Sequence, residues 1–544
     1  MKFSHLKSAL TAGAALMLAS SPLFFPSKSY AIPAFARQYQ TSCTTCHVDF
    51  PKLNDFGKAF KDAGFKFPVD DENSLKSPPV LLGSEAQKEA FPHAVWPGQI
   101  PGLPPIGLRM NNFLQFTSNN RSRFNALAVP GTTPQVIPGN DFETGLFSIF
   151  TAGNFGDGIA FWVDDDISVS GDNAAGSLGD AYVKFVNVSR LMKLPKDSLS
   201  FRVGQFELDL PVTQARTINL SPYDIYAQAN IGITPQGVGN QFTLASAARG
   251  AEVSGGHQYG GYHYSFAVFD QTTTGVAQSA NASAFVPSAT GSANGGVGFA
   301  SDTGMKNIYG RFSYRFNLER NRESRRAVQA ATATGPRDHT YLSFGTFYMR
   351  GDPQLAVVGE NADGTSKLLY AQAPFYRVGG DFSFNYQKLN IYGLYMYAHD
   401  DNRLPVDAFG VPIPLPLASG GPIPVGFVAH APVRFNGGFI QADYLALPWI
   451  MLIGRWDQVN STTDRINALG LADSTSYFAP YSSSRNRFTP GVQFLIRANL
   501  KASMEYQIRP QQSLTTVTNP VTGSQRATDP FRVNTVLFST EFVF

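Results

Sequence analysis

The long C-terminal part of the chain alternates apolar and polar residues with a period of two. In the segment 307–317 (NIYGRFSYRFN), Phe312 and Tyr314 share one face, and Arg311 and Arg315 share the other. Such alternation predicts β-strands with one apolar and one polar face. Repeated segments of about ten residues fit either a soluble β-sandwich or a membrane-spanning β-barrel.

Sixteen candidate strands follow one another along this part of the sequence. They are predicted to start near residues 106, 141, 157, 178, 198, 241, 258, 305, 339, 374, 388, 433, 448, 487, 500 and 531. The even number favours a closed antiparallel barrel over a sandwich. A barrel of this size is wide enough for an aqueous lumen. Its inward polar residues are expected to include Arg311, Arg315, Arg497, Glu505 and Arg509.

The connections between the candidate strands alternate in length. Long segments rich in Gly, Ser and Pro are expected at 118–140, 209–240, 271–304, 351–373, 400–432, 459–486 and 511–530. Mostly tight turns separate them, although 171–177 is short for an outer loop and 319–338 is long for an inner turn. With a periplasmic N-terminus, the long connections all fall outside the cell, as in outer-membrane barrels. Residues 101–544 are therefore predicted to form a porin-like transmembrane β-barrel of about sixteen strands.

The first 31 residues have the pattern of a secretory signal peptide. Lys2 and Lys7 precede an apolar run, and the small residue Ala31 ends the segment. The alternative is an uncleaved anchor, but Pro22 and Pro26 interrupt the run. Cleavage after Ala31 places the mature chain outside the cytoplasm. No later apolar run reaches the length of about eighteen residues that a transmembrane helix needs.

Charge and cysteine content exclude two other classes of protein. The formal net charge of +3 on 544 residues is too small to indicate a nucleic-acid partner. Two cysteines in an exported chain of this size do not form a disulfide framework.

Both cysteines lie in one short motif, Cys43-Thr44-Thr45-Cys46-His47. This is the attachment pattern of a c-type haem, in which two thiols bind the haem vinyl groups and the histidine is the proximal iron ligand. A thioredoxin-like pair needs a βαβ context that residues 32–70 lack. A structural zinc site needs four ligands, and only three cluster here. A simple disulfide remains open as a third alternative.

An amphipathic helix is predicted directly after the motif. Pro51 suits a helix start and Gly64 a helix end. The apolar face fits packing on a porphyrin and packing on protein equally well. That face consists of Leu53, Phe56, Phe60 and Ala63, and the polar face of Lys52, Asp55, Lys58, Lys61 and Asp62.

The sixth iron ligand is open at this point. His93 is the only other histidine between the signal peptide and the barrel, and it is the expected distal ligand. Met110, another barrel residue, water or an open position are the alternatives.

The segment 33–65, PAFARQYQTSCTTCHVDFPKLNDFGKAFKDAGF, followed by a long barrel, resembles the outer-membrane monohaem cytochrome–porin fusions of iron-oxidising bacteria. The close similarity covers about 33–66, and over the barrel it is one of architecture. The resemblance implies one covalent haem c held by Cys43 and Cys46, with His47 as proximal iron ligand. Residues 32–100 would then be a small α-helical monohaem cytochrome c domain and linker.

The resemblance also implies a function for the combined chain. It predicts an outer-membrane electron conduit that oxidises extracellular Fe(II), or another donor, and reduces a periplasmic cytochrome or other carrier. Such a chain would be an electron-transfer protein with Fe(II) oxidase-like activity, embedded in outer-membrane lipid of a Gram-negative bacterium, with its haem domain in the periplasm or the lumen. Two alternatives stay open: a porin or transporter whose haem domain is a plug or sensor, and outward electron transfer to an extracellular acceptor.

Overall fold

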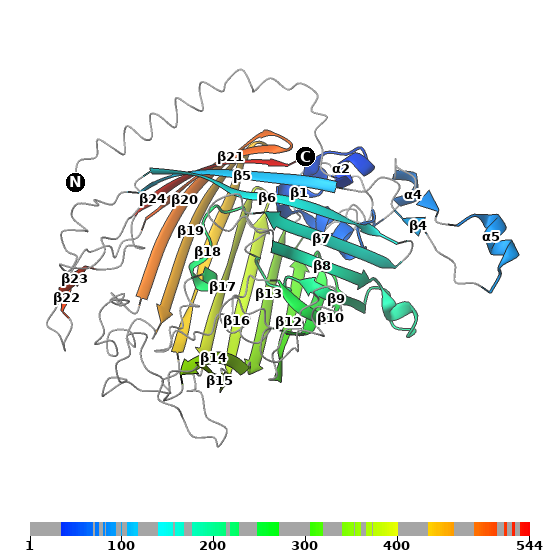
Figure 1. Cartoon of the computed structure of the whole chain (residues 1–544). Coiled ribbons are helices and arrows are strands. Elements are labelled where there is room, and N and C mark those ends of the chain that lie inside the picture. Colours follow the sequence, from blue (N-terminus) through cyan, green and yellow to red (C-terminus); the bar gives the residue numbers. More distant parts are fainter. Residues whose placement is uncertain are drawn as a thin grey trace.

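Sixteen antiparallel strands close into one barrel (Figure 1). The computed structural model describes residues 34–68, 71–74, 80–81, 83–93, 99–100, 106–117, 140–155, 158–167, 177–213, 218–227, 247–270, 305–318, 340–352, 354–360, 366–372, 374–400, 433–461, 484–508, 516–518, 525–527 and 534–543. The signal peptide predicted at 1–31 lies outside these residues. Among them, no helix is long and apolar enough to cross a membrane.

The barrel strands occur in chain order around the wall, and the last one pairs with the first. Thr540 of the last strand lies opposite Asn112 of the first. The strands are β5 (Ile106–Thr117), β6 (Asn140–Asn154), β7 (Ile159–Ile167), β8 (Ser177–Phe185), β9 (Ser200–Phe206), β10 (Ala248–Gly256), β11 (Gly261–Asp270), β12 (Met305–Asn317), β13 (Tyr341–Asp352), β16 (Phe375–Tyr386), β17 (Leu389–Asp400), β18 (Val433–Leu447), β19 (Ile450–Ser461), β20 (Ser484–Arg497), β21 (Leu500–Gln507) and β24 (Thr535–Val543).

The predicted sixteen-stranded antiparallel barrel is confirmed. Every predicted segment corresponds to one strand, and the largest displacement is at β10, which was expected from 241 and begins at Ala248. Among the described residues, four short two-stranded sheets lie outside the barrel sheet. Two belong to the N-terminal part of the chain, and the other two are β14 (Gln354–Glu360) with β15 (Ser366–Gln372), and β22 (Thr516–Thr518) with β23 (Gln525–Ala527).

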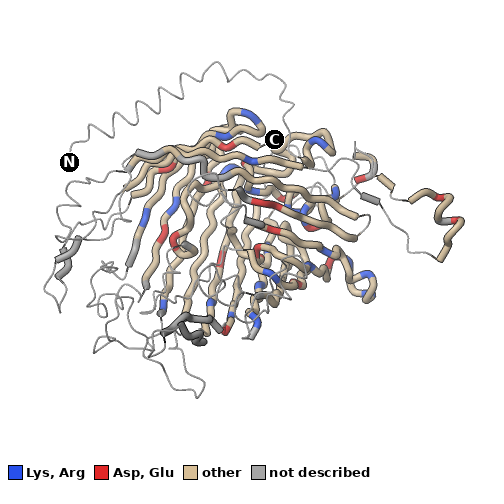
Figure 2. Tube along the Cα trace, viewed as in Figure 1, with Lys and Arg blue, Asp and Glu red and all other residues tan. Residues whose placement is uncertain are grey.

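Side chains on the wall alternate between an apolar outer face and a polar inner face. On β12, Phe312 is 51% exposed on the outside, and Arg315 is 4% exposed on the inside. On β19, Trp456 is half exposed and the adjacent Asp457 is fully buried. Lysine, arginine, aspartate and glutamate positions lie interspersed along the strands (Figure 2). Charge inside and apolar side chains outside is the reverse of a soluble protein, and it suits a wall that faces lipid.

Both ends of the barrel sequence lie at the same end of the barrel, because Val543 of β24 pairs with Arg109 near the start of β5. We call this the termini end. The tight turns that follow Tyr386, Leu447 and Arg497 lie at this end as well. The 3-10 turn η3 (Val188–Arg190) belongs to the longer connection between β8 and β9 at the same end.

A small N-terminal unit, residues 34–68, packs against the inner wall near the termini end. It consists of α2 (Ala34–Gln38), the 3-10 turn η2 (Cys43–Thr45), β1 (His47–Asp49), β2 (Lys52–Leu53) and α3 (Asp55–Asp62). The elements α4 (Asp71–Ser74), β3 (Val80–Leu81), α5 (Glu85–Ala90) and β4 (Gln99–Ile100) connect this unit to β5. Figure 1 shows α4, β4 and α5 standing apart from the barrel wall.

The connection between β9 and β10 folds back into the barrel. We call its described residues, 207–213 and 218–227, the luminal segment; it contains α7 (Asp224–Ala227). Glu505 of β21 accepts hydrogen bonds from the backbone N–H of Leu220 at 2.6 Å and of Ser221 at 3.0 Å. Arg487 of β20 forms an ion pair with Asp224 at 2.9 Å. The segment is therefore fixed to the inner wall by buried polar contacts.

The luminal segment also contributes apolar side chains to a core inside the barrel. Tyr223 stacks on Phe439 of β18 with ring centroids 3.9 Å apart. The buried members of this core include Leu208, Leu210, Ile225 and Tyr226 from the segment, and Tyr309, Phe347, Met349, Leu394, Met396 and Phe435 from the wall. The expectation of an aqueous lumen is therefore corrected at the level of the luminal segment, because the described residues there form a packed core.

The expected inward residues are placed as follows. Arg315 and Glu505 are buried on the inner face, and the Arg311 side chain is buried there too. Arg497 is half-buried at the end of β20. Arg509 lies outside the described residues.

Candidate functional site

The two cysteines lie on one tight turn with unpaired thiols. The N–H of Thr45 donates to the Ser42 oxygen at 3.0 Å, and the N–H of Cys46 donates to the Cys43 oxygen at 3.2 Å. Both cysteines are half-buried and form no disulfide. Burial raises the pKa of Cys43 to about 11 and that of Cys46 to about 12. A thioredoxin-like pair depends on a lowered thiol pKa, so this environment does not favour that alternative.

His47 follows the turn directly, and a backbone carbonyl orients its ring. Nδ1 lies 3.2 Å from the Pro51 oxygen. Because that oxygen can only accept, the contact places the proton on Nδ1. Burial lowers the pKa of His47 to about 4, which keeps the imidazole neutral at pH 7. A neutral ring held through Nδ1 presents Nε2 as the nitrogen for a metal ligand bond.

Asn54 joins the cysteine turn to α3. Its side-chain oxygen accepts from the N–H of Gly57 at 2.9 Å, which caps the helix. Its side-chain nitrogen donates to the Thr45 oxygen at 3.0 Å, and its backbone N–H donates to the Cys46 oxygen at 2.9 Å. The cap residue therefore also fixes the geometry of the cysteine turn.

The helix packs so closely on the turn that only glycine fits at position 57. A Cβ added to Gly57 would lie 2.1 Å from the Cys46 carbonyl oxygen. This glycine is in the middle of α3, where it costs helix stability relative to alanine. The close approach of helix and turn explains why a glycine stands at this position in spite of that cost.

The start of this helix differs from the prediction, and its end agrees with it. The helix begins at Asp55 after the cap Asn54, and Pro51 precedes β2 instead of starting the helix. Its end is as predicted, since Gly64 follows with a φ of +76°.

The aromatic face of α3 packs on protein. Phe60 meets Phe35 with ring centroids 4.9 Å apart, and Phe56 meets Phe67 at 5.1 Å. Both helix residues are buried. Of the two possibilities left open for this face, contact with protein is the one observed.

Asp55 was expected on the polar, solvated face of the helix, and this expectation was wrong. It is buried, and both of its oxygens accept hydrogen bonds from Arg315 of β12, at 2.7 and 2.6 Å. The Arg315 guanidinium lies 3.5 Å from the centroid of the Tyr341 ring. A bidentate pair of this kind fixes both distance and orientation between helix and wall.

Two lysines make further contacts between the N-terminal unit and the wall. Lys52 donates to Asp443 of β18 and to Asn390 of β17, both at 2.8 Å. Lys501 of β21 donates to the Phe50 carbonyl oxygen at 2.6 Å and pairs with Glu541 of β24 at 2.9 Å. The unit that carries Cys43–His47 is thus attached to strands on several sides of the barrel.

The candidate distal ligands lie elsewhere. His93 is exposed and follows α5, which Figure 1 shows standing apart from the barrel wall. Met110 is exposed on β5, on the face opposite Arg109 and Asn111, and Asn111 is buried. The structure does not bring either residue to His47, and the distal role of His93 stays a prediction.

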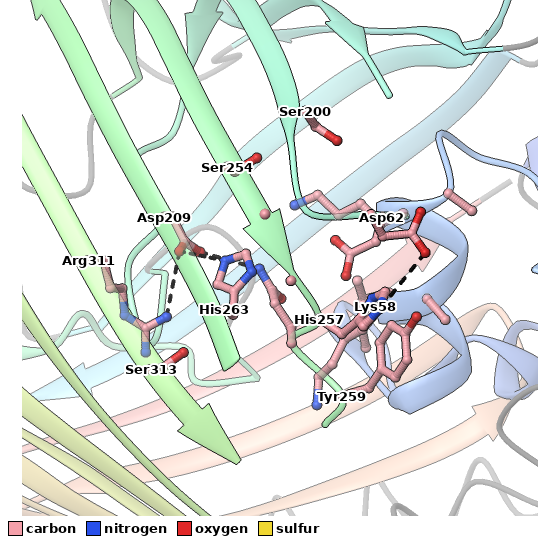
Figure 3. Close-up of a pocket in the computed structure, with 18 of the residues that line it drawn as sticks. Lys58, Asp62, Ser200, Asp209, Ser254, His257, Tyr259, His263, Arg311 and Ser313 are labelled. Atoms are coloured by element: carbon pink, nitrogen blue, oxygen red, sulfur yellow. Dashed lines mark hydrogen bonds and ion pairs between the residues drawn. The ribbon is translucent and has the colours of Figure 1, made fainter. Parts of the chain in front are cut away.

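A cavity of about 1560 Å³ lies between α3, the inner wall and the luminal segment (Figure 3). We call it the luminal chamber. Cys43, Cys46 and His47 are not among its lining residues. In the described part of the chain, no three His, Cys, Asp or Glu side chains are placed to hold a metal ion. The Cys-x-x-Cys-His turn and the chamber are therefore separate sites.

Comparison with known proteins finds similarity in solved structures alone. No protein-family model matches the chain, and no curated protein matches it. OmpT of Vibrio cholerae in its trimer form is 9% identical with a TM-score of 0.39, over 81% of this chain and 98% of that one. The anion-selective porin from Comamonas acidovorans is 11% identical with a TM-score of 0.42, over 81% and 98%. OprB of Pseudomonas putida is 8% identical with a TM-score of 0.40, over 81% and 94%. At these values the similarity says nothing of what this chain binds.

Proposed function

We propose that this protein is an outer-membrane electron conduit with one covalent c-type haem on its N-terminal unit. In this proposal it takes electrons from extracellular Fe(II), or another extracellular donor, and reduces a periplasmic cytochrome or other carrier. The observation that carries it is the attachment of the unit bearing Cys43, Cys46 and His47 to the inner wall of a closed barrel, through the ion pairs of Asp55 with Arg315 and of Lys52 with Asp443 and the hydrogen bond from Lys501 to the Phe50 carbonyl oxygen.

The residues of the attachment turn fit a haem c. Two unpaired thiols on one turn, Cys43 and Cys46, are the groups that form the two thioether bonds. His47 is held as the Nδ1–H tautomer by the Pro51 oxygen, and its neutral ring provides an axial ligand. A haem iron supplies one-electron chemistry between Fe(II) and Fe(III) when bound. Asn54 and Gly57 would keep the turn rigid during that change of charge.

The barrel supplies a route across an insulating membrane. Its outer face is apolar and its inner face is charged, which supports a position in the outer membrane of a Gram-negative bacterium. The termini end carries the N-terminal unit and, with a cleaved signal peptide, would face the periplasm. A periplasmic carrier would then reach the unit from that side.

The packed interior favours a conduit over an open diffusion porin. The luminal segment is held by Glu505 and Arg487 and forms a core with the wall, and the N-terminal unit occupies the lumen near the termini end. Both features restrict solute flow, whereas an electron carrier benefits from a lumen that excludes bulky oxidised iron. The direction of electron flow follows from the potentials of the partners.

Redox absorption spectroscopy tests the proposal. The purified, oxidised full-length protein is mixed with Fe(II), and reduction of a c-type haem spectrum is expected. The Cys43→Ala/Cys46→Ala variant, which cannot hold haem covalently, is the control and should give no such spectrum. The conduit is rejected if a haem is present and neither Fe(II) nor several other donors reduce it.

Conductance in planar bilayers tests the alternative, a porin or transporter with a haem plug or sensor. A conduit should show conductance well below that of open porins. Open-porin conductance that does not depend on the redox state would instead favour the transport function.

A further inference from the structure

The rim of the luminal chamber is rich in cations. Ten lysines and arginines line the chamber, against six aspartates and glutamates. The cations that we call the rim are partly or fully exposed: Lys61 and Lys66 from the N-terminal unit, and Lys184, Arg190 and Lys196 from β8 and the connection to β9. The exposed or partly exposed acids near them include Asp62 and Asp197. An opening with this excess of positive charge attracts anions and raises their local concentration.

The inner wall of the chamber presents buried donors that lack a protein partner. The Nε atoms of Arg311 and Arg202 are buried without a hydrogen-bond partner, although other nitrogens of both side chains form ion pairs. His263 of β11 donates through Nε2 to Asp209 at 2.9 Å, so Nδ1 of its neutral ring is an acceptor and is not counted among these donors. Figure 3 shows His263 and Arg311 side by side in the chamber, flanking Asp209.

An unpaired buried donor raises the free energy of the folded protein. The occurrence of two in one cavity therefore indicates that an acceptor binds there. Each loses its hydrogen bond to water on folding and regains none when nothing accepts its hydrogen. Three of the six acids that line the chamber are engaged by its other side chains: Asp209 with His263, Asp381 with Arg311 at 3.0 Å, and Glu252 with Arg202 at 2.6 Å. A ligand with several oxygen acceptors and negative charge would satisfy the inner donors and be attracted by the rim.

We infer that the luminal chamber is a binding site for a small multivalent oxyanion, either a polycarboxylate or a polyphosphate. The anion enters past the lysines of the rim and accepts hydrogen bonds from Arg202 and Arg311. The site goes beyond the proposed electron transfer. It does not depend on haem, because Cys43, Cys46 and His47 do not line the chamber.

Isothermal titration calorimetry of the full-length protein in detergent tests this inference. Citrate represents the polycarboxylates and pyrophosphate the polyphosphates, and the tighter of the two identifies the ligand class. Acetate, a monovalent anion, is the control for valence. Spermidine, a polyvalent cation, is the control for the sign of charge. Saturable binding of citrate or pyrophosphate is expected, with affinity falling as salt concentration rises. If neither anion binds saturably, or if spermidine binds better than both, the inference is wrong.

Charge removal at the rim provides a matched pair of variants. The first is Lys61→Gln/Lys66→Gln/Lys184→Gln, whose residues line the chamber; the second is Lys193→Gln/Lys306→Gln/Lys388→Gln, whose residues do not. We expect the first to bind about tenfold more weakly, since partly exposed charges each contribute modestly. The second should bind as the parent does. Equal losses in both variants would show a general charge effect and overturn the site.

The haem-less Cys43→Ala/Cys46→Ala variant separates this inference from the proposed function. It should bind the same anion with unchanged affinity while lacking the haem spectrum. Loss of anion binding in this variant would contradict a chamber site that is independent of the attachment turn.

Discussion

Arg315 of β12 donates two hydrogen bonds to Asp55 of α3, at 2.7 and 2.6 Å, and both side chains are buried. The pair joins the barrel wall to the helix whose cap fixes the cysteine turn. Removing one partner of a buried ion pair costs about 3–5 kcal/mol when nothing else pairs with the remaining charge, and Asp55 would keep the partly exposed Lys58 at 3.3 Å. The position of the candidate haem unit therefore depends on a contact between two residues that are far apart in the sequence.

Replacement of Arg315 by methionine is expected to release the N-terminal unit while the barrel stays folded. Trypsin cleavage at Lys58 and Lys61 should become about a hundredfold faster, because local opening exposes them more often. The double variant Asp55→Asn/Arg315→Met, which removes both charges, should recover part of the protection. Arg190→Met is the exposed control and should leave the cleavage rate unchanged.

Replacement of Gly57 by alanine should disturb the attachment turn. In most helices this change stabilises by about 1 kcal/mol. Here the new Cβ would lie 2.1 Å from the Cys46 oxygen, so helix and turn must separate. We expect less covalent haem per protein, measured by pyridine haemochrome absorbance. Lys61→Ala, on the same helix, should retain the parental haem content; parental content in Gly57→Ala would contradict the close packing.

The charge of Lys501 should raise the reduction potential of the proposed haem. Its ammonium bonds the Phe50 carbonyl oxygen at 2.6 Å, three residues after His47. A nearby positive charge favours the reduced iron, so Lys501→Gln should lower the midpoint potential by an amount on the order of 30 mV. Glu541→Gln, which removes the acid paired with Lys501, should shift it upward. Equal potentials in both variants, measured by spectroelectrochemistry, would place the haem away from this ion pair.

The thermal stability of the protein is expected to depend on pH through Asp209 of the luminal segment. Burial alone would raise its pKa, but His263 at 2.9 Å and Arg311 at 3.7 Å, with Arg202 nearby, hold the pKa of this carboxyl well below its usual range. A carboxyl whose pKa is lower in the folded than in the unfolded state stabilises the fold at pH values above its unfolded pKa. This stabilisation is lost as the pH falls below that value. Parent protein should therefore melt higher than Asp209→Asn from pH 7 to about 4, and the difference should shrink below about pH 4. A constant difference down to pH 2 would contradict this coupling.

The barrel was predictable because each strand is specified by a local sequence pattern. Period-two alternation specifies each strand, and Phe312 and Arg315 occupy the faces that alternation predicts. The end of α3 was predictable for the same reason, since Gly64 supplies a positive φ. The environment of Asp55 was not, because its partner Arg315 is 260 residues away and the helix pattern alone indicates a solvated face.

The luminal segment was missed because residues 209–240 resemble an outer loop in composition. One signal was present: Ile218, Tyr223, Ile225 and Tyr226 are too apolar and closely spaced for a solvated loop. Their partners on the wall, such as Phe439, are recognisable as partners only once the barrel closes. The paired contacts of Lys52 and Lys501 were hidden in the same way, since neither residue carries a local pattern that names its partner.

Replacement of Glu505 by alanine should loosen the luminal segment. This carboxylate accepts hydrogen bonds from the N–H groups of Leu220 and Ser221 and from the Ser221 hydroxyl, at 2.6, 3.0 and 2.7 Å. Its loss leaves the buried N–H groups of Leu220 and Ser221 without this acceptor, so the segment should detach from β21, although Arg455 keeps its ion pair with Asp457 at 2.8 Å. We expect larger and noisier single-channel conductance in planar bilayers than the parent shows. Glu505→Gln keeps an acceptor and should lie between the two, and the wall variant Lys388→Gln should match the parent. Unchanged conductance in Glu505→Ala would mean that other contacts, such as Arg487 with Asp224, suffice to keep the lumen closed.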